Sequence, residues 1–112
     1  MTSLIPAHPP KTSHLERITD DFGVWQFYDY KNQQILREHG YALDDSARAL
    51  IAFLLYGKKE LAQVCMKYLS ASLKDRKMVG FFNEKRENIV YPSSEDAFGL
   101  AAWALAYGVE NG

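Results

Sequence analysis

Two segments of this chain are apolar on nearly every side when they are read as helices. Residues 97–109 contain no charged side chain. Residues 45–56 carry an apolar stripe with helical spacing, and further small or apolar residues fill most of the other positions. A helix that is apolar all round must be surrounded by other elements. A chain of 112 residues with three or four helices cannot surround two such helices. We therefore expect either the opening part of a larger layered structure or an assembly of several copies.

The spacing of apolar residues predicts three helices. The first covers 45–56 and ends at the following glycine, Gly57. The second covers 59–73 and has a single apolar face, as in an ordinary surface helix. The third covers 94–107 and again ends at a glycine, Gly108. The amphipathic helix thus lies between the two apolar ones along the chain.

The remaining segments have weaker patterns. Residues 14–19 can form one short helical turn, and residues 24–28 are aromatic and β-prone. Residues 29–41 are polar and are expected to be irregular. Two β-prone runs, 78–82 and 88–91, flank a charged tip and predict a hairpin-like loop.

An internal repeat relates residues 40–57 to residues 91–108. In both segments an acidic pair opens the helix, small residues line its middle, and Tyr-Gly closes it. The offset between the two segments is longer than the period of the common short helical repeats, which is about 33–34 residues. The repeat favours an all-α domain of antiparallel helical hairpins with short β-like loops, arranged as a stack or a ring.

Composition excludes several classes of function. The 13 Lys and Arg nearly balance the 14 Asp and Glu, so a basic stripe for nucleic acid is not available. The single cysteine, Cys65, excludes an intramolecular disulfide framework and a multi-cysteine zinc site, and we interpret it as a small hydrophobe. The uncharged stretch at 97–109 is too short to span a bilayer. Because residues 1–6 lack the pattern of a signal peptide, we expect a cytoplasmic protein that is not bound to a membrane.

The first 13 residues differ in composition from the rest. They contain Pro6, Pro9 and Pro10, three of the four prolines, and show no apolar periodicity. We interpret residues 1–13 as a Pro-rich lead-in. Residues 14–112 are then expected to form one domain of about two helical hairpins.

Several motifs of this domain resemble one family. They are HLERITDDFG from His14, GY from Gly40, DDSARAL from Asp44, and ED from Glu95 with the glycine and the WAL string that follow. Together they resemble the helical domain that follows or accompanies many bacterial glycosyltransferases, within the six-hairpin glycosidase superfamily. The resemblance covers residues 14–105. It implies the N-terminal portion of an (α/α)6 toroid, in which helix ends and loops surround a sugar-sized cleft.

The same resemblance implies a ligand and partners. The ligand would be a sugar or an oligosaccharide, and the partner a glycosyltransferase domain or a further copy of the chain. In the family, polar residues usually follow the second acidic pair, commonly with a His among them, and an Arg follows the glycine. Here those positions hold Ala97, Phe98 and Leu100. A cleft that depends on that imidazole or guanidinium would lack it in this chain.

The two acidic pairs, Asp44 with Asp45 and Glu95 with Asp96, are the candidate catalytic residues. Glycoside hydrolysis needs two carboxyl groups, one held protonated as the acid and the other ionised. The alternative is structural, because acidic residues in a first helical turn can cap backbone N–H groups and suit the helix dipole. The pattern leaves both interpretations open.

Five further residues are candidate substrate ligands. Arg48 lies one turn after the first acidic pair, where it can bind sugar hydroxyls or form a weak surface ion pair. Trp25 and Tyr41 can stack on sugar rings, although such residues more often pack loops onto helix ends. His14 and Asp21 belong to the leading motif, where Asp21 can equally stabilise the turn. No His or Cys spacing indicates a metal site, so we predict neither a metal nor a cofactor.

The sequence supports three hypotheses of function and leaves open whether the chain is an enzyme. The first is a carbohydrate-active protein, catalytically incomplete as this chain, that acts on or binds a glycoside or oligosaccharide. The second is a non-enzymatic helical module that self-associates or docks on a partner domain, because residues 97–109 form an apolar helix that nothing in the chain covers. The third, a sugar isomerase or epimerase, rests only on analogy of fold.

Overall fold

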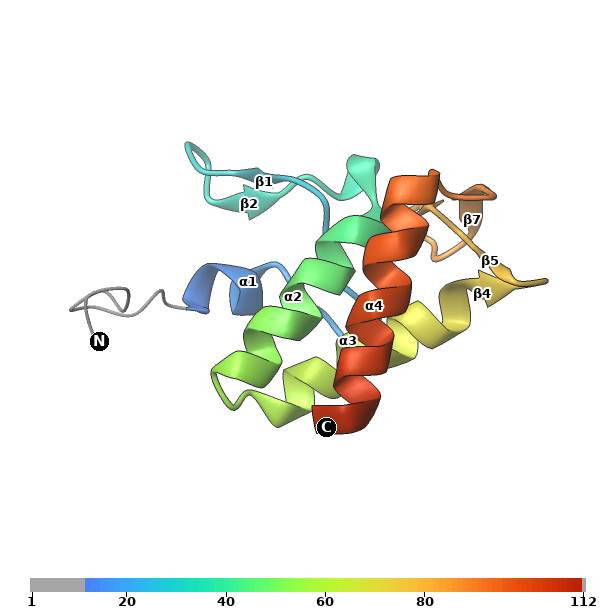
Figure 1. Cartoon of the computed structure of the whole chain (residues 1–112). Helices are drawn as coiled ribbons and strands as arrows, with labels where there is room; N and C mark the ends of the chain where they lie inside the picture. The colour runs from blue at the N-terminus through green and yellow to red at the C-terminus, as the bar shows by residue number, and fades with distance from the viewer. Residues whose placement is uncertain (1–11, 112) are drawn as a thin grey trace.

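A computed structural model of the chain describes residues 12–111. Within that part, three long helices pack against one another: α2 (Leu43–Leu55), α3 (Lys59–Ser72) and α4 (Glu95–Asn111). A short turn at Gly57 joins α2 to α3, and α4 lies beside α2 and runs in the same direction (Figure 1). The structure thus confirms the three helices that the spacing of apolar residues predicts. The predicted end of the last helix at Gly108 is wrong, because α4 continues to Asn111 and Gly108 packs inside it against Leu50 and Met66.

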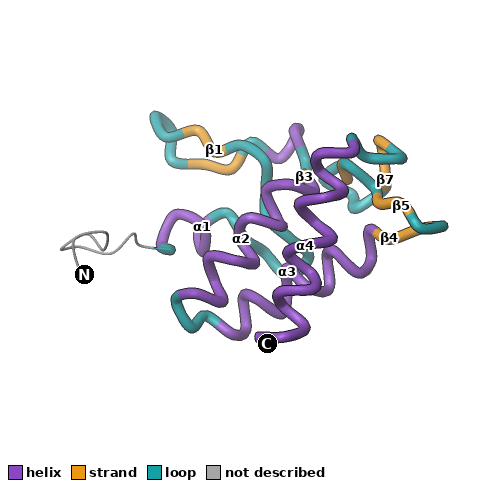
Figure 2. Tube along the Cα trace, in the orientation of Figure 1, coloured by secondary structure: helices purple, strands orange, loops and turns teal. Residues whose placement is uncertain are grey.

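The shorter elements lie at the periphery of these helices (Figure 2). The helix α1 (Ser13–Arg17) precedes the first strands, and the 3₁₀ turn η2 (Arg37–His39) follows them. In residues 12–111 the strands form three antiparallel sheets: β1 (Tyr28–Asp29) with β2 (Gln34–Ile35), β4 (Leu73–Lys74) with β5 (Lys77–Met78), and β6 (Phe81–Phe82) between β3 (Tyr41–Ala42) and β7 (Asn88–Val90).

The expected all-α domain of helical hairpins, part of an (α/α)6 toroid, is wrong. The described residues are mixed α/β, with 52% in helices and 18% in strands. The β-prone runs form backbone-paired strands, and β6 pairs both with its hairpin partner β7 and with the more distant strand β3. The Leu43 N–H donates to the Gly80 carbonyl at 2.9 Å, and the Gly80 N–H donates to the Val90 carbonyl at 2.7 Å. Such pairing satisfies the backbone of segments that no helix includes.

The segment that was expected to be irregular also contains regular pairing. Residues 29–41 include most of the β1–β2 hairpin, with Tyr28 opposite Ile35 and Asp29 opposite Gln34. The hairpin escapes a pattern-based prediction because its strands are only two residues long. A run that short cannot display the alternation by which strands are recognised.

Gly40 is required where η2 gives way to β3. Its backbone has φ 67° and ψ −147°, a conformation that essentially only glycine adopts without strain. A Cβ atom at this position would lie 2.1 Å from the carbonyl oxygen of Phe82. The absence of a side chain therefore allows β3 to approach β6, and this contact fixes the start of α2.

The core is centred on α2. Its residues Ala47, Leu50 and Phe53 are fully buried, and α3 contributes a buried face that includes Tyr68 and Leu69. In contrast, α4 buries only a narrow strip of small residues, Ala101, Ala104 and Gly108. The outer side of α4 is open to solvent. The sequence predicted that other elements would surround this helix, but in the structure they cover only one side of it.

The predicted Pro-rich lead-in, residues 1–13, falls almost entirely outside the described residues. Its last two residues belong to the fold: Thr12 is buried, and Ser13 begins α1. The Thr12 hydroxyl donates to a carboxylate oxygen of Glu16 at 2.6 Å, one turn further along. Across residues 12–111, the helices are all too short or too polar to cross a membrane.

Candidate functional site

The two acidic pairs open two neighbouring helices. In Figure 1, α2 and α4 begin at the same end of the molecule. The segment around β5 and β6 connects the two starts, since the Leu43 N–H binds the Gly80 carbonyl and the Ser93 N–H binds the Met78 carbonyl at 2.8 Å. Asp44 and Asp45 therefore begin one helix, and Glu95 and Asp96 begin the helix beside it, as the internal repeat predicts.

The first acidic pair forms a compact group with Arg48. A guanidinium nitrogen of Arg48 lies 3.6 Å from an oxygen of Asp44 and 4.0 Å from an oxygen of Asp45. The Asp44 carboxylate also accepts the Asp45 N–H at 3.0 Å. The residue that precedes the helix is Ala42, and it offers no side-chain cap. Arg48 is 65% exposed, so it faces solvent and is not buried against the carboxylates.

Asp45 has an unusual protonation equilibrium. Burial, and then the negative charge of Asp44, raise the pKa of the Asp45 carboxyl to about 6, while Arg48 acts in the opposite direction. At a pH near 6 this carboxyl is therefore protonated in a substantial fraction of molecules. An acid that can release a proton thus lies beside a second carboxyl group and a guanidinium.

Tyr68 belongs to the same region, and no pattern in the sequence marks it as functional. Its ring is 1% exposed, and its hydroxyl is buried without a hydrogen-bond partner among the described residues. Burial, and then the charge of Asp45, raise the pKa of the Tyr68 hydroxyl. From the sequence, Tyr68 is only one member of the apolar face of α3.

The second acidic pair is more exposed. The cap of α4 comes from Ser94, whose hydroxyl oxygen accepts the Ala97 N–H at 3.1 Å. Ser94 therefore takes the capping role, and Glu95 and Asp96 lie exposed in the first turn of α4. Glu95 also borders a cavity of about 280 Å³ together with Arg76 and Phe98.

Trp25 and Tyr41 lie in the core beneath this end of the molecule. Their rings stack with centroids 4.2 Å apart, and they are 5% and 0% exposed. The Tyr41 hydroxyl donates to a carboxylate oxygen of Asp20 at 2.6 Å. Both rings therefore pack the loops onto the start of α2. A sugar could reach them only if those loops moved.

Asp21 is held by a residue that the sequence analysis missed. Arg86, at the tip of the β6–β7 hairpin, forms an ion pair with Asp21 and lies 3.8 Å from Asp20. Its guanidinium lies over the Phe22 ring, 5.1 Å from the centroid. Hydrogen bonding to Arg86 lowers the pKa of the Asp21 carboxyl. Because 65 residues separate the two partners, no local pattern could indicate this contact.

His14 lies in a different group, in α1. Its ring stacks on Tyr30 at 5.2 Å and meets the edge of Tyr28 at 5.5 Å, so it packs against the β1–β2 hairpin. Within residues 12–111, no three His, Cys, Asp or Glu side chains are grouped closely enough to hold a metal ion.

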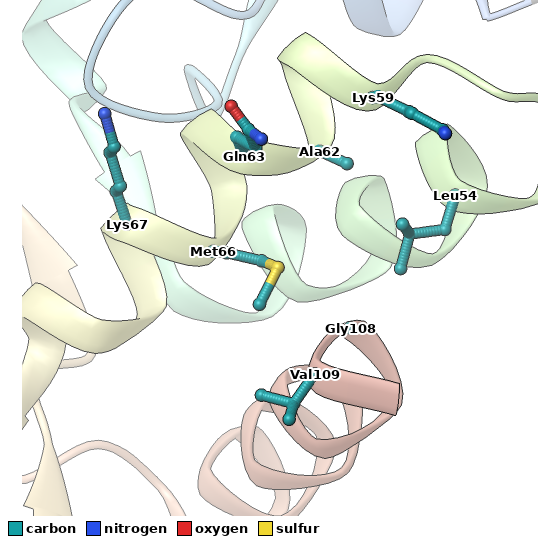
Figure 3. Close-up of a pocket in the computed structure, with 8 residues that line it drawn as sticks. All are labelled: Leu54, Lys59, Ala62, Gln63, Met66, Lys67, Gly108 and Val109. Carbon is teal, nitrogen blue, oxygen red and sulfur yellow. The ribbon is translucent and has the colours of Figure 1, made fainter. Parts of the chain in front are cut away.

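The groove in Figure 3 lies where α2, α3 and α4 meet, and has a volume of about 340 Å³. Leu54, Met66 and Val109 extend into it from the three helices, and two lysines of α3 lie at its edges. The groove contains no predicted site residue. It is mostly apolar and offers none of the paired carboxyl chemistry found at the start of α2.

Comparisons with protein-family models, with curated proteins and with solved structures find no match to this chain. Function is therefore inferred from the side chains and their geometry.

Proposed function

We propose that this protein is a carbohydrate-active protein that binds a sugar or oligosaccharide at the start of α2, with Asp44, Asp45 and Arg48 as its ligands. The observation that carries the proposal is the raised pKa of Asp45, about 6, next to Asp44 and Arg48. The motifs that resemble the glycosyltransferase-linked helical domain support the same ligand class.

The chemistry suits hydroxyl groups. A sugar hydroxyl both donates and accepts hydrogen bonds. A protonated Asp45 can donate to it, while an ionised Asp44 accepts from it and Arg48 donates to it. With Asp45 as the acid and Asp44 as the ionised carboxyl, the two aspartates would also meet the requirement of glycoside hydrolysis for one protonated and one ionised carboxyl group. Glu95 and Asp96 would supply further acceptors from α4.

The experiment is a titration of the full chain with cello-, malto- and chito-oligosaccharides, followed by amide chemical shifts. We expect shifts at Asp44, Asp45 and Arg48. The variant Asp44→Asn should weaken binding about tenfold, because the hydrogen bond from a sugar hydroxyl to the ionised Asp44 carboxylate is lost. The matched variant Asp75→Asn removes a carboxyl from the β4–β5 turn and should bind like the wild type. Unchanged binding by Asp44→Asn would refute the proposed site.

A second candidate function is an interaction module that self-associates through α4. It is favoured by the exposed side of that helix, where Trp103 is 57% exposed and Val109 is 71% exposed. Leu55, 64% exposed, lies near the end of α2, the helix against which α4 packs. Exposed apolar residues of this size mark interfaces when they are contiguous. The oligomeric state of the chain tests this candidate.

A further inference from the structure

A polar cavity lies between α1 and the β1–β2 hairpin, in the part of the fold that holds His14. It has a volume of about 450 Å³ and is lined by Arg17, Tyr28, Tyr30 and Gln33. Its size is within the range of small-molecule sites. The residues proposed above as sugar ligands at the start of α2 do not line it.

Two residues that line this cavity, Tyr28 and Tyr30, form an aromatic cluster with His14. The His14 ring meets the edge of Tyr28 at 5.5 Å and stacks on Tyr30 at 5.2 Å, and the two tyrosine rings meet edge to face at 5.2 Å. Tyr30 is nevertheless 69% exposed. Its ring is therefore supported by its neighbours and open to solvent, as a platform for a sugar ring requires.

The Tyr30 hydroxyl is oriented by His14. It lies 3.0 Å from the Nε2 atom of the imidazole. The other ring nitrogen, Nδ1, is buried and has no hydrogen-bond partner among the described residues. A buried N–H without an acceptor is costly, so we assign the proton of the neutral ring to Nε2. His14 then donates to Tyr30, and the phenol O–H of Tyr30 remains free to donate to a ligand.

Arg17 supplies the charge of the cavity. Its guanidinium lies over the Tyr28 ring, 5.6 Å from the centroid. Among residues 12–111, no carboxylate lies within ion-pair distance of Arg17. This contact with the face of the Tyr28 ring leaves the N–H groups of Arg17 available for a carboxylate. Among the residues that the structure describes, none that lines the cavity is acidic, so its electrostatics favour an anion.

Hydrogen bonds from the backbone to the Asp29 side chain hold the turn of the hairpin that carries Tyr30 and Gln33. The Asp29 carboxylate accepts the backbone N–H groups of Lys31 at 3.0 Å and Asn32 at 3.2 Å. Gln33 follows with φ 53°, a left-handed conformation that is uncommon outside glycine. The turn thereby brings the Gln33 amide to the cavity, where it can donate to and accept from ring hydroxyls.

We propose that this cavity binds an acidic sugar, a uronate, whose ring stacks on Tyr30 and whose carboxylate binds Arg17. The proposal rests on the proposed function, since it assumes a carbohydrate ligand. It adds a second binding site and the chemical class of the sugar in it. His14 is a positioning residue here, because it acts through Tyr30.

The test compares methyl glucuronide with methyl glucoside, two probes that differ in the carboxylate, by amide shifts of the full chain. We expect the glucuronide to shift Tyr30 and Gln33 and to bind about fivefold more tightly than the glucoside. Arg17→Gln should remove that preference, and Tyr30→Ala should weaken both sugars. The control variants Arg76→Gln and Tyr56→Ala change an arginine and an exposed tyrosine elsewhere and should change neither result.

Equal binding of the two sugars at the hairpin would overturn the proposal, as would shifts that avoid the hairpin. If a sugar shifts Asp44 and Asp45 but not Tyr30, the proposed function survives and this inference fails. If neither probe shifts either site, and the oligosaccharides above also fail to bind, both fail. Retained amide dispersion in Tyr30→Ala would show that a loss of binding is not a loss of fold.

Discussion

Burial of the Asp45 carboxyl couples the protonation of one side chain to the stability of the fold. Because its pKa is raised above the ordinary value of 3.8 to about 6, the folded state holds this proton more tightly than the unfolded state does. The contribution of Asp45 is therefore full below its ordinary pKa and is lost as the pH rises through about 6.

We accordingly expect Asp45→Asn to raise the free energy of unfolding at about pH 7.5 by about 1 kcal/mol, and to have little effect at about pH 4. The value is modest because the side chain is 34% exposed and water screens the cost. Urea unfolding of both proteins at the two pH values measures the difference. A variant that is less stable than the wild type at the higher pH would contradict the raised pKa.

The hydrogen bond between Tyr41 and Asp20 should contribute measurably to stability. The bond is 2.6 Å long and its donor ring is fully buried. We expect Tyr41→Phe to lower the free energy of unfolding by about 1.5 kcal/mol, since a bond to a carboxylate is lost. Denaturant unfolding checks the value. Tyr56→Phe, at an exposed tyrosine, is the control, and an equal loss in both variants would exclude a specific role for this bond.

At the level of elements, the approach of β3 to β6 depends on Gly40. We expect Gly40→Ala to destabilise the fold by at least about 3 kcal/mol, because the new methyl group would meet the Phe82 carbonyl and the backbone conformation would be strained.

The matched variant is Gly57→Ala. Gly57 also has a positive φ, 72°, but a Cβ atom there would meet nothing within 4 Å. It should cost only about 1 kcal/mol, the strain of the left-handed conformation alone. Thermal unfolding of the two variants separates the steric cost from the backbone cost. Equal losses would show that the contact with Phe82 is not limiting.

At the level of the whole molecule, the open side of α4 governs self-association. If a second copy covers that side, light scattering on the wild type should give about twice the chain mass of 12.8 kDa. Trp103→Glu should then give the mass of one chain, because it places a charge in an apolar contact. Ile89→Glu makes the same change at an exposed residue of β7 and should leave the mass unchanged. A wild type that remains monomeric at high micromolar concentration would exclude the interaction module that self-associates.

The candidate site was only partly predictable. Asp44, Asp45 and Arg48 could be grouped from the sequence, because residues three and four apart lie on one face of a helix. The role of Ser94 as a cap could be predicted for the same local reason. Arg86 and Tyr68 could not be added to the site, because their contacts depend on how distant segments fold against one another.

The sequence by itself determined the three long helices and the turn at Gly57 that ends α2, but not the end of α4, which continues through Gly108 to Asn111. Periodic burial and glycine positions act within a few residues, so their signal is contained in the local sequence. Only the tertiary structure decided that β3 pairs with β6, that Arg86 reaches Asp21, and that α4 buries a single narrow side. The pairing of β3 with β6 joins two-residue strands that are separated by two helices in the sequence, so it carries almost no local pattern and forms only when the packing of the helices brings the strands together.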